Sequence, residues 1–284
     1  MSSSTPPLSH VRRVAIVGTG SRGLMFTKAI LSRKSTCSLV AFCDPNPVRV
    51  AYYNSYISSS PSIPAYHPDN FLEMLENESV DTLVVTCIDA LHHKYIVPAL
   101  ERGIRVISEK PLTTSIENCR LINDTVNRTN GDLTITFNYR YNPVHQTVKQ
   151  LLSTKNAIGS ILSVHFEWLL DTVHGADYFR RWHKQKENSG GLMVHKSGHH
   201  FDLVNWWIDD EPVEVAGMGR TAFYGSENGK KFGWVKGEGY ERARGSREAT
   251  NDPFALDIEA DETLKALYAD AEKEDGYYRD QNVS

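Results

Sequence analysis

The sequence predicts an α/β protein whose first half is a parallel sheet with helices on both faces. Two observations carry this prediction. Short apolar runs alternate with amphipathic stretches between residues 14 and 137, and strands that alternate with helices form parallel sheets. The first apolar run ends directly at residues 18–23, which read GTGSRG. A strand, a glycine turn and a helix in this order are typical of a dinucleotide-binding Rossmann unit.

The glycine turn has a spacing that suits a pyrophosphate. Gly18 allows the tight turn, Gly20 lets a phosphate approach the backbone, and Gly23 lets the next helix pack close to the strand. The amides at the start of that helix, those of Ser21 and Arg22 among them, suit a doubly charged phosphate bridge. The turn alone is a weak signal, so its context decides the prediction.

A carboxylate at the end of the second apolar run strengthens the prediction. Residues 39–43 are followed by Asp44, at roughly the 20-residue spacing from the glycines that such folds show. There the carboxylate can accept the hydroxyls of an adenine ribose and repel a 2'-phosphate. The alternative is that Asp44, followed by Pro45, only starts a turn. Asp44 favours NAD over NADP, whereas Arg22 and Arg49 leave NADP open.

The remaining elements of the first half follow the same alternation. The pattern predicts helices over residues 69–76, 91–101 and 115–128, and strands over residues 82–86, 105–108 and 133–137. In such sheets ligands bind at the carboxyl ends of the strands. Polar residues just beyond those ends are therefore candidates for ligand contacts: Thr86, Asp89, His92, Glu109, Lys110 and Asn138.

Lys110 is the candidate with the clearest chemistry. It lies in the stretch EKPL, directly after a predicted buried strand. An ammonium there can hydrogen-bond a substrate hydroxyl and stabilise the alkoxide that forms during oxidation. The alternative is a surface lysine paired with Glu109.

Composition excludes several classes of protein. The chain has 284 residues, of which 40% are hydrophobic, and a formal net charge of -4; it offers no basic block for nucleic acid. No apolar run approaches the roughly 18 residues of a membrane helix, and residues 1–10 predict a disordered tail rather than a signal peptide. The four cysteines show no disulfide or metal spacing, so we expect a cytoplasmic location.

The combined motifs carry a family likeness. The stretches GTGSRG, LHHKYIVPALERG, EKPL and GGLMVHKSGHHFD, together with Asp44, resemble the Gfo/Idh/MocA oxidoreductases, which include glucose–fructose oxidoreductase and inositol dehydrogenase. The resemblance implies a Rossmann domain over residues 11–138 and an α/β domain with an open, mostly antiparallel sheet over residues 139–284. It also implies NAD, with NADP left open, and carbohydrate-like substrates such as sugars and polyols.

The resemblance also assigns roles to two residues. The family's lysine matches Lys110, and its histidine matches His199. Family members commonly carry an aspartate four residues before that histidine, where this sequence has His195. An imidazole can still shuttle protons, but it adds no fixed negative charge.

The three histidines at residues 195–200 allow three interpretations. If residues 195–207 form one helix, His195, His199 and Asp202 share a face, and two histidines with a carboxylate at this spacing suit a metal site. If the helix begins near Gly198, His195 lies close by but is not strictly aligned with the other two. Hydride transfer to a nicotinamide requires no metal, however, and no cysteine supports one, so we expect none. The second interpretation is core packing, with Phe201 in the buried surround and His200, Trp206 and Trp207 as structural residues.

The third interpretation is proton transfer, which we favour. An imidazole titrates near pH ~6.5 in water, so His199, with His195 as second candidate, can remove the proton of a secondary alcohol while Lys110 steadies the oxyanion. Aromatic faces and forked donors suit a polyhydroxylated ligand. The candidates for the substrate pocket are Tyr139, Arg140, Tyr141, Arg180, Arg181, Trp182 and His183. For Arg180 and Arg181 the alternative is an ordinary solvated pair.

The second half is expected to be shortened. The pattern predicts helices over residues 142–153, 195–207 and 261–274, strands over residues 161–170 and 213–223, and a flexible glycine-rich loop over residues 225–247. By the resemblance, relatives continue further and complete the second sheet. An incomplete sheet exposes an edge and an apolar face, which predicts a homo-oligomer.

Two classes of function follow. The leading prediction is an NAD(P)-dependent oxidoreductase that acts on CH–OH groups of a sugar, polyol or related secondary alcohol. A chemical variant uses NAD to assist elimination or glycoside cleavage. The alternative is a nucleotide-binding protein without turnover, which the shortened second domain and His195 suggest.

Overall fold

The computed structural model describes residues 10–58, 62–154, 157–234 and 254–270, together with residues 247, 250 and 252. These residues group into two units, residues 10–135 with 258–270 and residues 136–257. The sequence instead assigns all of residues 139–284 to the second domain. Most of the predicted tail and residues 235–246 of the predicted loop lie outside the described residues.

The first unit contains a six-stranded parallel sheet in the order β3-β2-β1-β4-β5-β6. Its strands are β1 (Arg12–Val17), β2 (Cys37–Cys43), β3 (Ala65–Tyr66), β4 (Thr82–Val85), β5 (Arg105–Ser108) and β6 (Leu133–Ile135). The predicted parallel sheet is confirmed. Strand β1 pairs with both β2 and β4, so the strand order reverses there, and ligands bind at such switch points.

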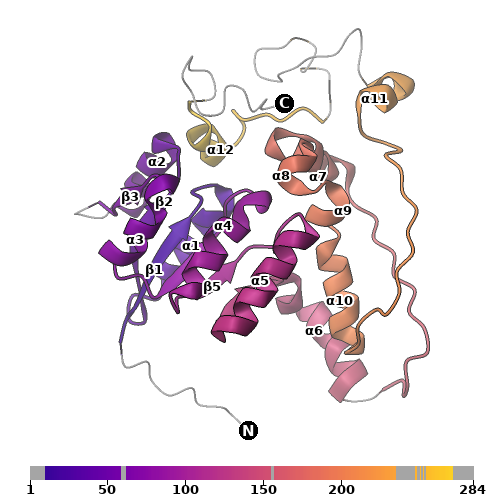
Figure 1. The fold of residues 1–284 in the computed structure, drawn as a ribbon. Helices are drawn as coiled ribbons and strands as arrows, with labels where there is room; N and C mark the ends of the chain where they lie inside the picture. Colours follow the sequence, from indigo (N-terminus) through magenta and orange to yellow (C-terminus); the bar gives the residue numbers. More distant parts are fainter. Residues whose placement is uncertain are drawn as a thin grey trace. The chain divides into compact units, whose positions relative to one another are not determined.

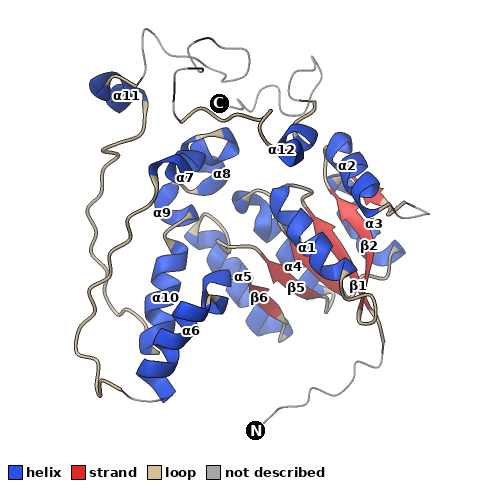
Figure 2. Ribbon diagram, turned by 180° about the vertical axis from the view of Figure 1, so that it is seen from behind, coloured by secondary structure: helices blue, strands red, loops and turns tan. Residues whose placement is uncertain are grey.

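Helices flank this sheet, as Figures 1 and 2 show. They are α1 (Ser21–Leu31), α2 (Pro47–Ile57), α3 (Phe71–Asn77), α4 (His92–Glu101), α5 (Ile116–Thr129) and α12 (Glu262–Leu267). The sequence pattern did not predict α2, whose start is fixed by Pro47 and by the Asn46 side chain, which accepts hydrogen bonds from two helix amides. Helix α12 is shorter than the predicted helix over residues 261–274.

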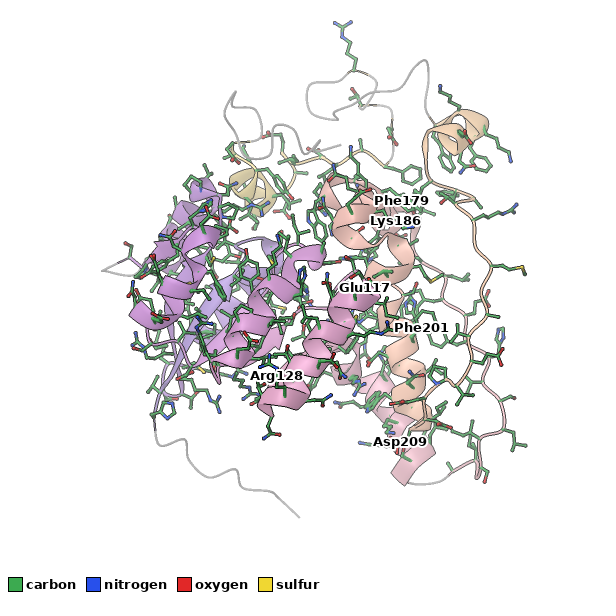
Figure 3. The ribbon with its side chains drawn as sticks, viewed as in Figure 1. Glu117, Arg128, Phe179, Lys186, Phe201 and Asp209 are labelled. Carbon is green, nitrogen blue, oxygen red and sulfur yellow. The ribbon has the colours of Figure 1, made fainter. Side chains whose placement is uncertain are left out.

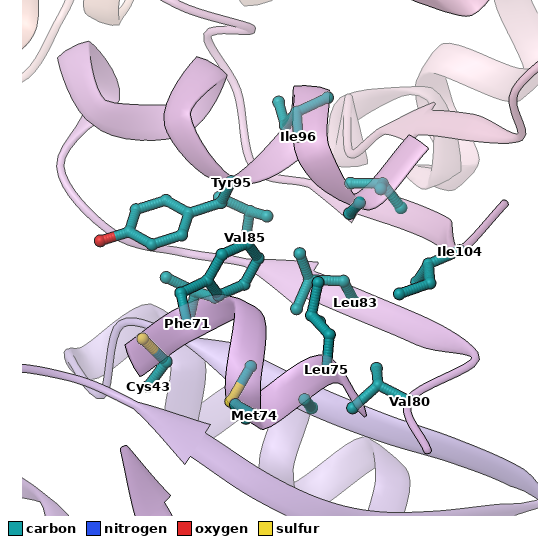
Figure 4. Packing of buried hydrophobic residues seen from close by; sticks show 14 of the residues in the cluster. Cys43, Phe71, Met74, Leu75, Val80, Leu83, Val85, Tyr95, Ile96 and Ile104 are labelled. Carbon is teal, nitrogen blue, oxygen red and sulfur yellow. The ribbon is translucent and has the colours of Figure 1, made fainter. Parts of the chain in front are cut away.

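The core of the first unit lies between the central strands and helices α3 and α4 (Figure 4). The rings of Phe71 and Tyr95 meet edge to face, with centroids 4.9 Å apart, and Met74, Leu83 and Ile96 are fully buried. Cys43 belongs to this core. Its burial, reinforced by the neighbouring Asp44 carboxylate, raises the pKa of its thiol to about 12, so the cysteine acts as a small hydrophobic residue.

The second unit consists of helices and extended chain. The helices are α6 (Pro143–Lys149), followed by a π-helical turn (Gln150–Thr154), α7 (Thr172–Ala176), α8 (Lys186–Ser189), α9 (Leu192–His195), α10 (Gly198–Ile208) and α11 (Ser226–Phe232). Helix α11 falls within residues 225–247, where the sequence predicts a loop. No helix among the described residues of either unit is long and apolar enough to cross a membrane.

The strands predicted over residues 161–170 and 213–223 are not formed. The described part of the second unit contains no strand, and both segments run as extended loop (Figure 2). Leu162 is 95% exposed and Met218 is 103% exposed. An alternating pattern shows that a segment can join a sheet, but a strand also needs a neighbouring strand to receive its backbone hydrogen bonds.

Candidate functional site

The glycine turn joins β1 to α1, where the sequence predicts it. Gly18 has a φ of +89°, and a Cβ there would lie 2.6 Å from the amide nitrogen of Cys87. A Cβ at Gly23 would lie 2.5 Å from the carbonyl oxygen of Gly18. The backbone itself therefore requires these two glycines. At Gly20 the nearest described atom to a Cβ is Nη1 of Arg49, at 3.5 Å, so this position leaves room for a ligand.

The start of α1 presents amide groups beside that room. Gly20 is the N-cap residue; among the described residues no side chain caps the helix, and its first turn contains no acidic residue. The amides of Ser21, Arg22 and Gly23 are therefore oriented as a helix N-terminus that favours an anion. A pyrophosphate fits this cradle.

Asp44 lies at the end of β2, next to the glycine turn. Its Oδ2 accepts a hydrogen bond from the Thr19 amide at 2.6 Å, and its Oδ1 accepts one from the Asn46 amide at 2.8 Å. Each carboxylate oxygen has a second lone pair, so Asp44 can still accept ribose hydroxyls while the two amides fix its position. The aspartate both forms the turn and suits the ribose.

Arg22 and Glu109 link α1 to the end of β5. The Nε of Arg22 donates to Oε1 of Glu109 at 2.7 Å, and Glu109 is buried. The second oxygen of Glu109 accepts a hydrogen bond from the backbone nitrogen of Lys110 at 3.3 Å. Lys110 is half-buried directly after β5. Glu109 thus fixes the backbone that carries Lys110, and Arg22 compensates the buried negative charge.

Thr86 and His92 belong to the scaffold of the glycine turn and the loop after β5. The hydroxyl of Thr86 donates to the carbonyl oxygen of Gly18 at 2.7 Å. His92 is 0% exposed, and its ring nitrogens lie 3.0 Å from the carbonyl oxygen of Pro111 and 3.2 Å from that of Cys87. The His92 ring is therefore enclosed between backbone carbonyl groups, and its contact with the cofactor stays a prediction.

In the second unit, His199 lies near the start of α10 and packs on Tyr139. The two rings are stacked, with centroids 4.2 Å apart and an interplanar angle of 8°. Phe137 meets the imidazole edge to face at 6.1 Å, and His199 is 4% exposed. The predicted pocket residue Tyr139 therefore lies directly against the predicted base.

Lys196 is a residue of this site that the sequence analysis missed. Its Nζ donates to the Tyr139 hydroxyl at 2.9 Å and lies 5.2 Å and 5.8 Å from the ring centroids of Tyr139 and Tyr178. Burial lowers the pKa of Lys196, but the hydroxyls of Tyr139 and Tyr178 raise it further, so the net shift of the pKa is upward. A lysine within a stretch of apolar and aromatic residues is the signal that would have found it.

His195 lies in a neighbouring aromatic group. Its ring centroid is 5.5 Å from those of Tyr178 and Trp182 and 4.8 Å from that of His183. His195 ends α9, whereas His199 belongs to α10. Of the two helix starts that the sequence allows, the structure has the one at Gly198, so His195 lies before α10 and is not strictly aligned with His199.

Arg140 and Asp202 form a two-pronged ion pair. The Nε and Nη2 atoms of Arg140 donate to the two oxygens of Asp202 at 2.9 Å and 2.5 Å, and the Asp202 side chain is buried. These hydrogen bonds raise the pKa of Arg140. Asp202 is thus committed to Arg140 rather than to an imidazole. The described residues contain no group of three or more potential metal ligands.

Arg180 and Arg181 both approach Asp177. Their Nη2 atoms lie 2.9 Å and 3.9 Å from its Oδ1, and their side chains are 10% and 16% exposed. The alternative of an ordinary solvated pair is therefore wrong. Asp177 holds these two guanidinium groups close to the turn that carries Trp182.

The remaining aromatic residues of α10 pack as predicted, with one exception. His200 stacks on Trp168 with centroids 4.6 Å apart, and Nε1 of Trp207 donates to the His145 carbonyl oxygen at 3.0 Å. Phe201, which the sequence placed in the buried surround, is 59% exposed on α10 (Figure 3).

A six-stranded parallel sheet with a glycine turn and a strand-end aspartate defines a dinucleotide-binding protein of the Rossmann class. Residues 12–137 match the model of an oxidoreductase family with an NAD-binding Rossmann fold, and residues 149–258 match the C-terminal α/β domain of the same family. The chain belongs to this family, the Gfo/Idh/MocA oxidoreductases.

Individual relatives agree with this membership. YteT of Bacillus subtilis, whose name classes it as an oxidoreductase, is 36% identical over 220 residues, which are 77% of this chain and 51% of YteT. The chain spans about half the length of this curated relative.

Two solved structures share the fold. One is scyllo-inositol dehydrogenase from Lactobacillus casei with bound NAD(H) and scyllo-inositol, with a TM-score of 0.58, 23% identity, and coverage of 70% of this chain and 57% of that chain. The other is the WlbA dehydrogenase from Chromobacterium violaceum with NADH and UDP-GlcNAcA, with a TM-score of 0.60, 22% identity, and coverage of 73% and 58%.

Proposed function

We propose that this protein is an NAD(P)-dependent oxidoreductase that transfers a hydride between the nicotinamide and a CH–OH group of a sugar, polyol or related secondary alcohol. The observation that carries the proposal is the contrast within the glycine turn. At Gly18 and Gly23, backbone atoms occupy the space that a side chain would need. At Gly20 that space is open, beside Asp44 and the start of α1. The inositol and the nucleotide sugar bound by the two relatives support a polyhydroxylated substrate.

When bound, the nicotinamide supplies the hydride acceptor. Lys110 is assigned to donate a hydrogen bond to the reacting oxygen and to stabilise its developing negative charge. His199 is assigned to take the hydroxyl proton at a ring nitrogen, with His195 as a second proton carrier. Tyr139 fixes the plane of the His199 ring by stacking, and Lys196 fixes Tyr139 through its hydroxyl, so Lys196 acts as a positioning residue.

The assigned pocket and assembly are part of the same proposal. Tyr139, Trp182 and Arg181 would contact the substrate, and Arg140 would shape the pocket while paired with Asp202. We also assign a cytoplasmic location, which the four free cysteines support. A homo-oligomer is supported by exposed apolar side chains such as Leu162 and Val213.

The experiment is a calorimetric titration with NAD and with NADP, followed by absorbance of the reduced nicotinamide with a panel of inositols, free sugars and nucleotide sugars. We expect coenzyme binding and turnover of at least one substrate. Lys110→Ala and His199→Ala should keep coenzyme binding and lower kcat by about 10²- to 10⁴-fold. Lys186→Ala, an exposed lysine (Figure 3), is the matched control. Unchanged kcat in both site variants would refute the assigned roles.

A second function is favoured by one observation. His199 is 4% exposed. An imidazole enclosed in this way has little access to a substrate hydroxyl, which fits a protein that binds the coenzyme without turnover. It would give heat on titration with NAD and no absorbance change with any member of the panel.

A further inference from the structure

Residues 258–270 pack onto the coenzyme-binding unit although they follow the whole second unit in the chain. Helix α12 lies beside α2, as Figures 1 and 2 show. Ile258 is 3% exposed, Leu267 is 0% exposed and Tyr268 is 4% exposed. The burial of these three apolar side chains holds the segment in place.

The segment makes its polar contacts with the residues that surround the glycine turn. The Nε of Arg49 donates to the carbonyl oxygen of Leu267 at 3.1 Å, and the Arg49 guanidinium lies 5.0 Å from the centroid of the Tyr268 ring. The same guanidinium borders the open side of Gly20. On the sequence alone, Arg49 leaves binding of NADP possible. In the structure this arginine is buried and in contact with residues 258–270.

A second contact reaches the strand-end aspartate through one residue. The backbone nitrogen of Asn46 donates to Oδ1 of Asp44, and its side-chain Nδ2 donates to Oδ2 of Asp270 at 3.2 Å. Asn46 is 0% exposed and Asp270 is 4% exposed. The segment therefore places a second buried carboxylate on the residue that positions Asp44.

The other arginine of the turn is engaged as well. Arg22 donates to Glu109 at 2.7 Å. In Rossmann folds an arginine near the end of the second strand accommodates the 2'-phosphate of NADP, whereas a carboxylate there binds the 2'-hydroxyl of NAD. Because Arg22 and Arg49 are engaged in other contacts, they are not oriented to bind the 2'-phosphate of NADP. The carboxylates of Asp44 and Asp270 favour the 2'-hydroxyl of NAD.

We infer that residues 258–270 set the coenzyme preference of this protein, which rests on the proposed binding of a dinucleotide at the glycine turn. The backbone of Leu267 and the ring of Tyr268 hold Arg49 in its present orientation. Asp270 adds a buried carboxylate that binds Asn46, the residue whose backbone amide holds Asp44. Together they favour a ribose with a free 2'-hydroxyl and repel a 2'-phosphate, which carries nearly two negative charges near neutral pH. The segment is a specificity element supplied from the far end of the sequence.

The test compares the dissociation constants of NAD and NADP, measured by calorimetry on the 284-residue chain. Asp270→Asn removes the charge and keeps an oxygen that can accept the hydrogen bond of Asn46. We expect the ratio Kd(NADP)/Kd(NAD) to fall about tenfold, because the negative charge held on Asn46 is removed. Tyr268→Leu keeps an apolar side chain in the buried position but removes the ring face under Arg49. We expect the same ratio, Kd(NADP)/Kd(NAD), to fall about threefold in this variant.

The matched control is Glu262→Gln, which removes an exposed negative charge from the same segment. It should leave the ratio unchanged, and melting curves check that all three variants fold. If NAD binds but the ratio is the same in Asp270→Asn, Tyr268→Leu and the control, the inference is refuted while the proposed function stands. If neither coenzyme binds the unaltered chain, the proposed function and the inference both fall.

Discussion

The two units are stabilised by different kinds of interaction. In the first unit, backbone hydrogen bonds join six parallel strands around an apolar core. In the second unit the described residues form no strand, and the candidate site depends on pairs of side chains: His199 with Tyr139, Lys196 with Tyr139, and Arg140 with Asp202. The stability of the first unit should therefore be sensitive to a side chain added where backbone segments pack closely. The stability of the second unit should be sensitive to the loss of particular side-chain charges.

The largest effect on the first unit is expected at the glycine turn. In Gly18→Ala the new Cβ would meet the backbone of residues 86 and 87 at 2.6–2.8 Å, at a positive φ. We expect the first unit to lose about 3 kcal/mol of unfolding free energy. Gly20→Ala meets only ordinary contacts in the described structure, so its stability should change by less than about 1 kcal/mol while its affinity for NAD falls.

Urea unfolding followed by circular dichroism measures the first effect, and calorimetry measures the second. Equal stability of Gly18→Ala and Gly20→Ala would mean that the turn does not have the geometry described. Equal coenzyme affinity of Gly20→Ala and the unaltered chain would mean that the open side of Gly20 does not receive the pyrophosphate.

The next effect is expected at the ion pair of the second unit. Asp202→Asn removes the charge of a buried carboxylate that receives two hydrogen bonds from Arg140, and we expect a loss of about 2 kcal/mol. Asp209→Asn, at the C-cap of the same helix (Figure 3), is the control, because Asp209 is 90% exposed and 3.8 Å from Lys149. It should change stability by no more than about 0.5 kcal/mol.

Tryptophan fluorescence isolates this measurement. The tryptophans of the chain all lie in the second unit, at residues 168, 182, 206, 207 and 234. Unfolding followed by fluorescence therefore reports the second unit. If both aspartate variants unfolded alike, the Arg140–Asp202 pair would not stabilise that unit.

The same contrast explains how much of the fold could be predicted from the sequence. The ends of β4 and β5 lie within two residues of the ends predicted from the sequence. These strands are predictable because each is a local apolar run that ends at a polar residue. The segments at 161–170 and 213–223 show an equally good local pattern. They fail as strands because pairing depends on a neighbour that a local pattern does not specify.

The site shows the same division. The glycines and Asp44 are recognisable because the backbone requires them at a fixed spacing. The pairing of Lys196 with Tyr139 spans 57 residues, and that of Arg49 with Leu267 spans 218 residues, so no local spacing reveals either one. His92 follows the end of a strand as predicted, but its position in the chain does not determine which way the ring points.

A smaller effect is expected from acid. Burial, reinforced by the charge of Lys196, lowers the pKa of His200. Because the pKa is lower in the folded than in the unfolded state, the contribution of His200 is present above pH ~6.5 and is lost as the pH falls through the folded-state value. The melting temperature seen by tryptophan fluorescence should therefore fall between about pH 7.5 and pH 5.5, and less so in His200→Gln.

His165→Gln is the control for this measurement, because His165 is exposed in the same unit. It should keep the full pH dependence of the unaltered chain. An equal fall in all three proteins would show that His200 does not have the lowered pKa from which this prediction follows.

The smallest effect is expected in the extended segments of the second unit, and it tests the comparison most directly. Leu162 and Met218 are 95% and 103% exposed, so Leu162→Ser and Met218→Ser should each change the unfolding free energy by less than about 0.5 kcal/mol. Leu203→Ala on α10, where the side chain is 0% exposed, should cost about 2–5 kcal/mol. If either exposed substitution cost as much as Leu203→Ala, these segments would be packed in solution, and the second unit would be stabilised by more than its side-chain pairs.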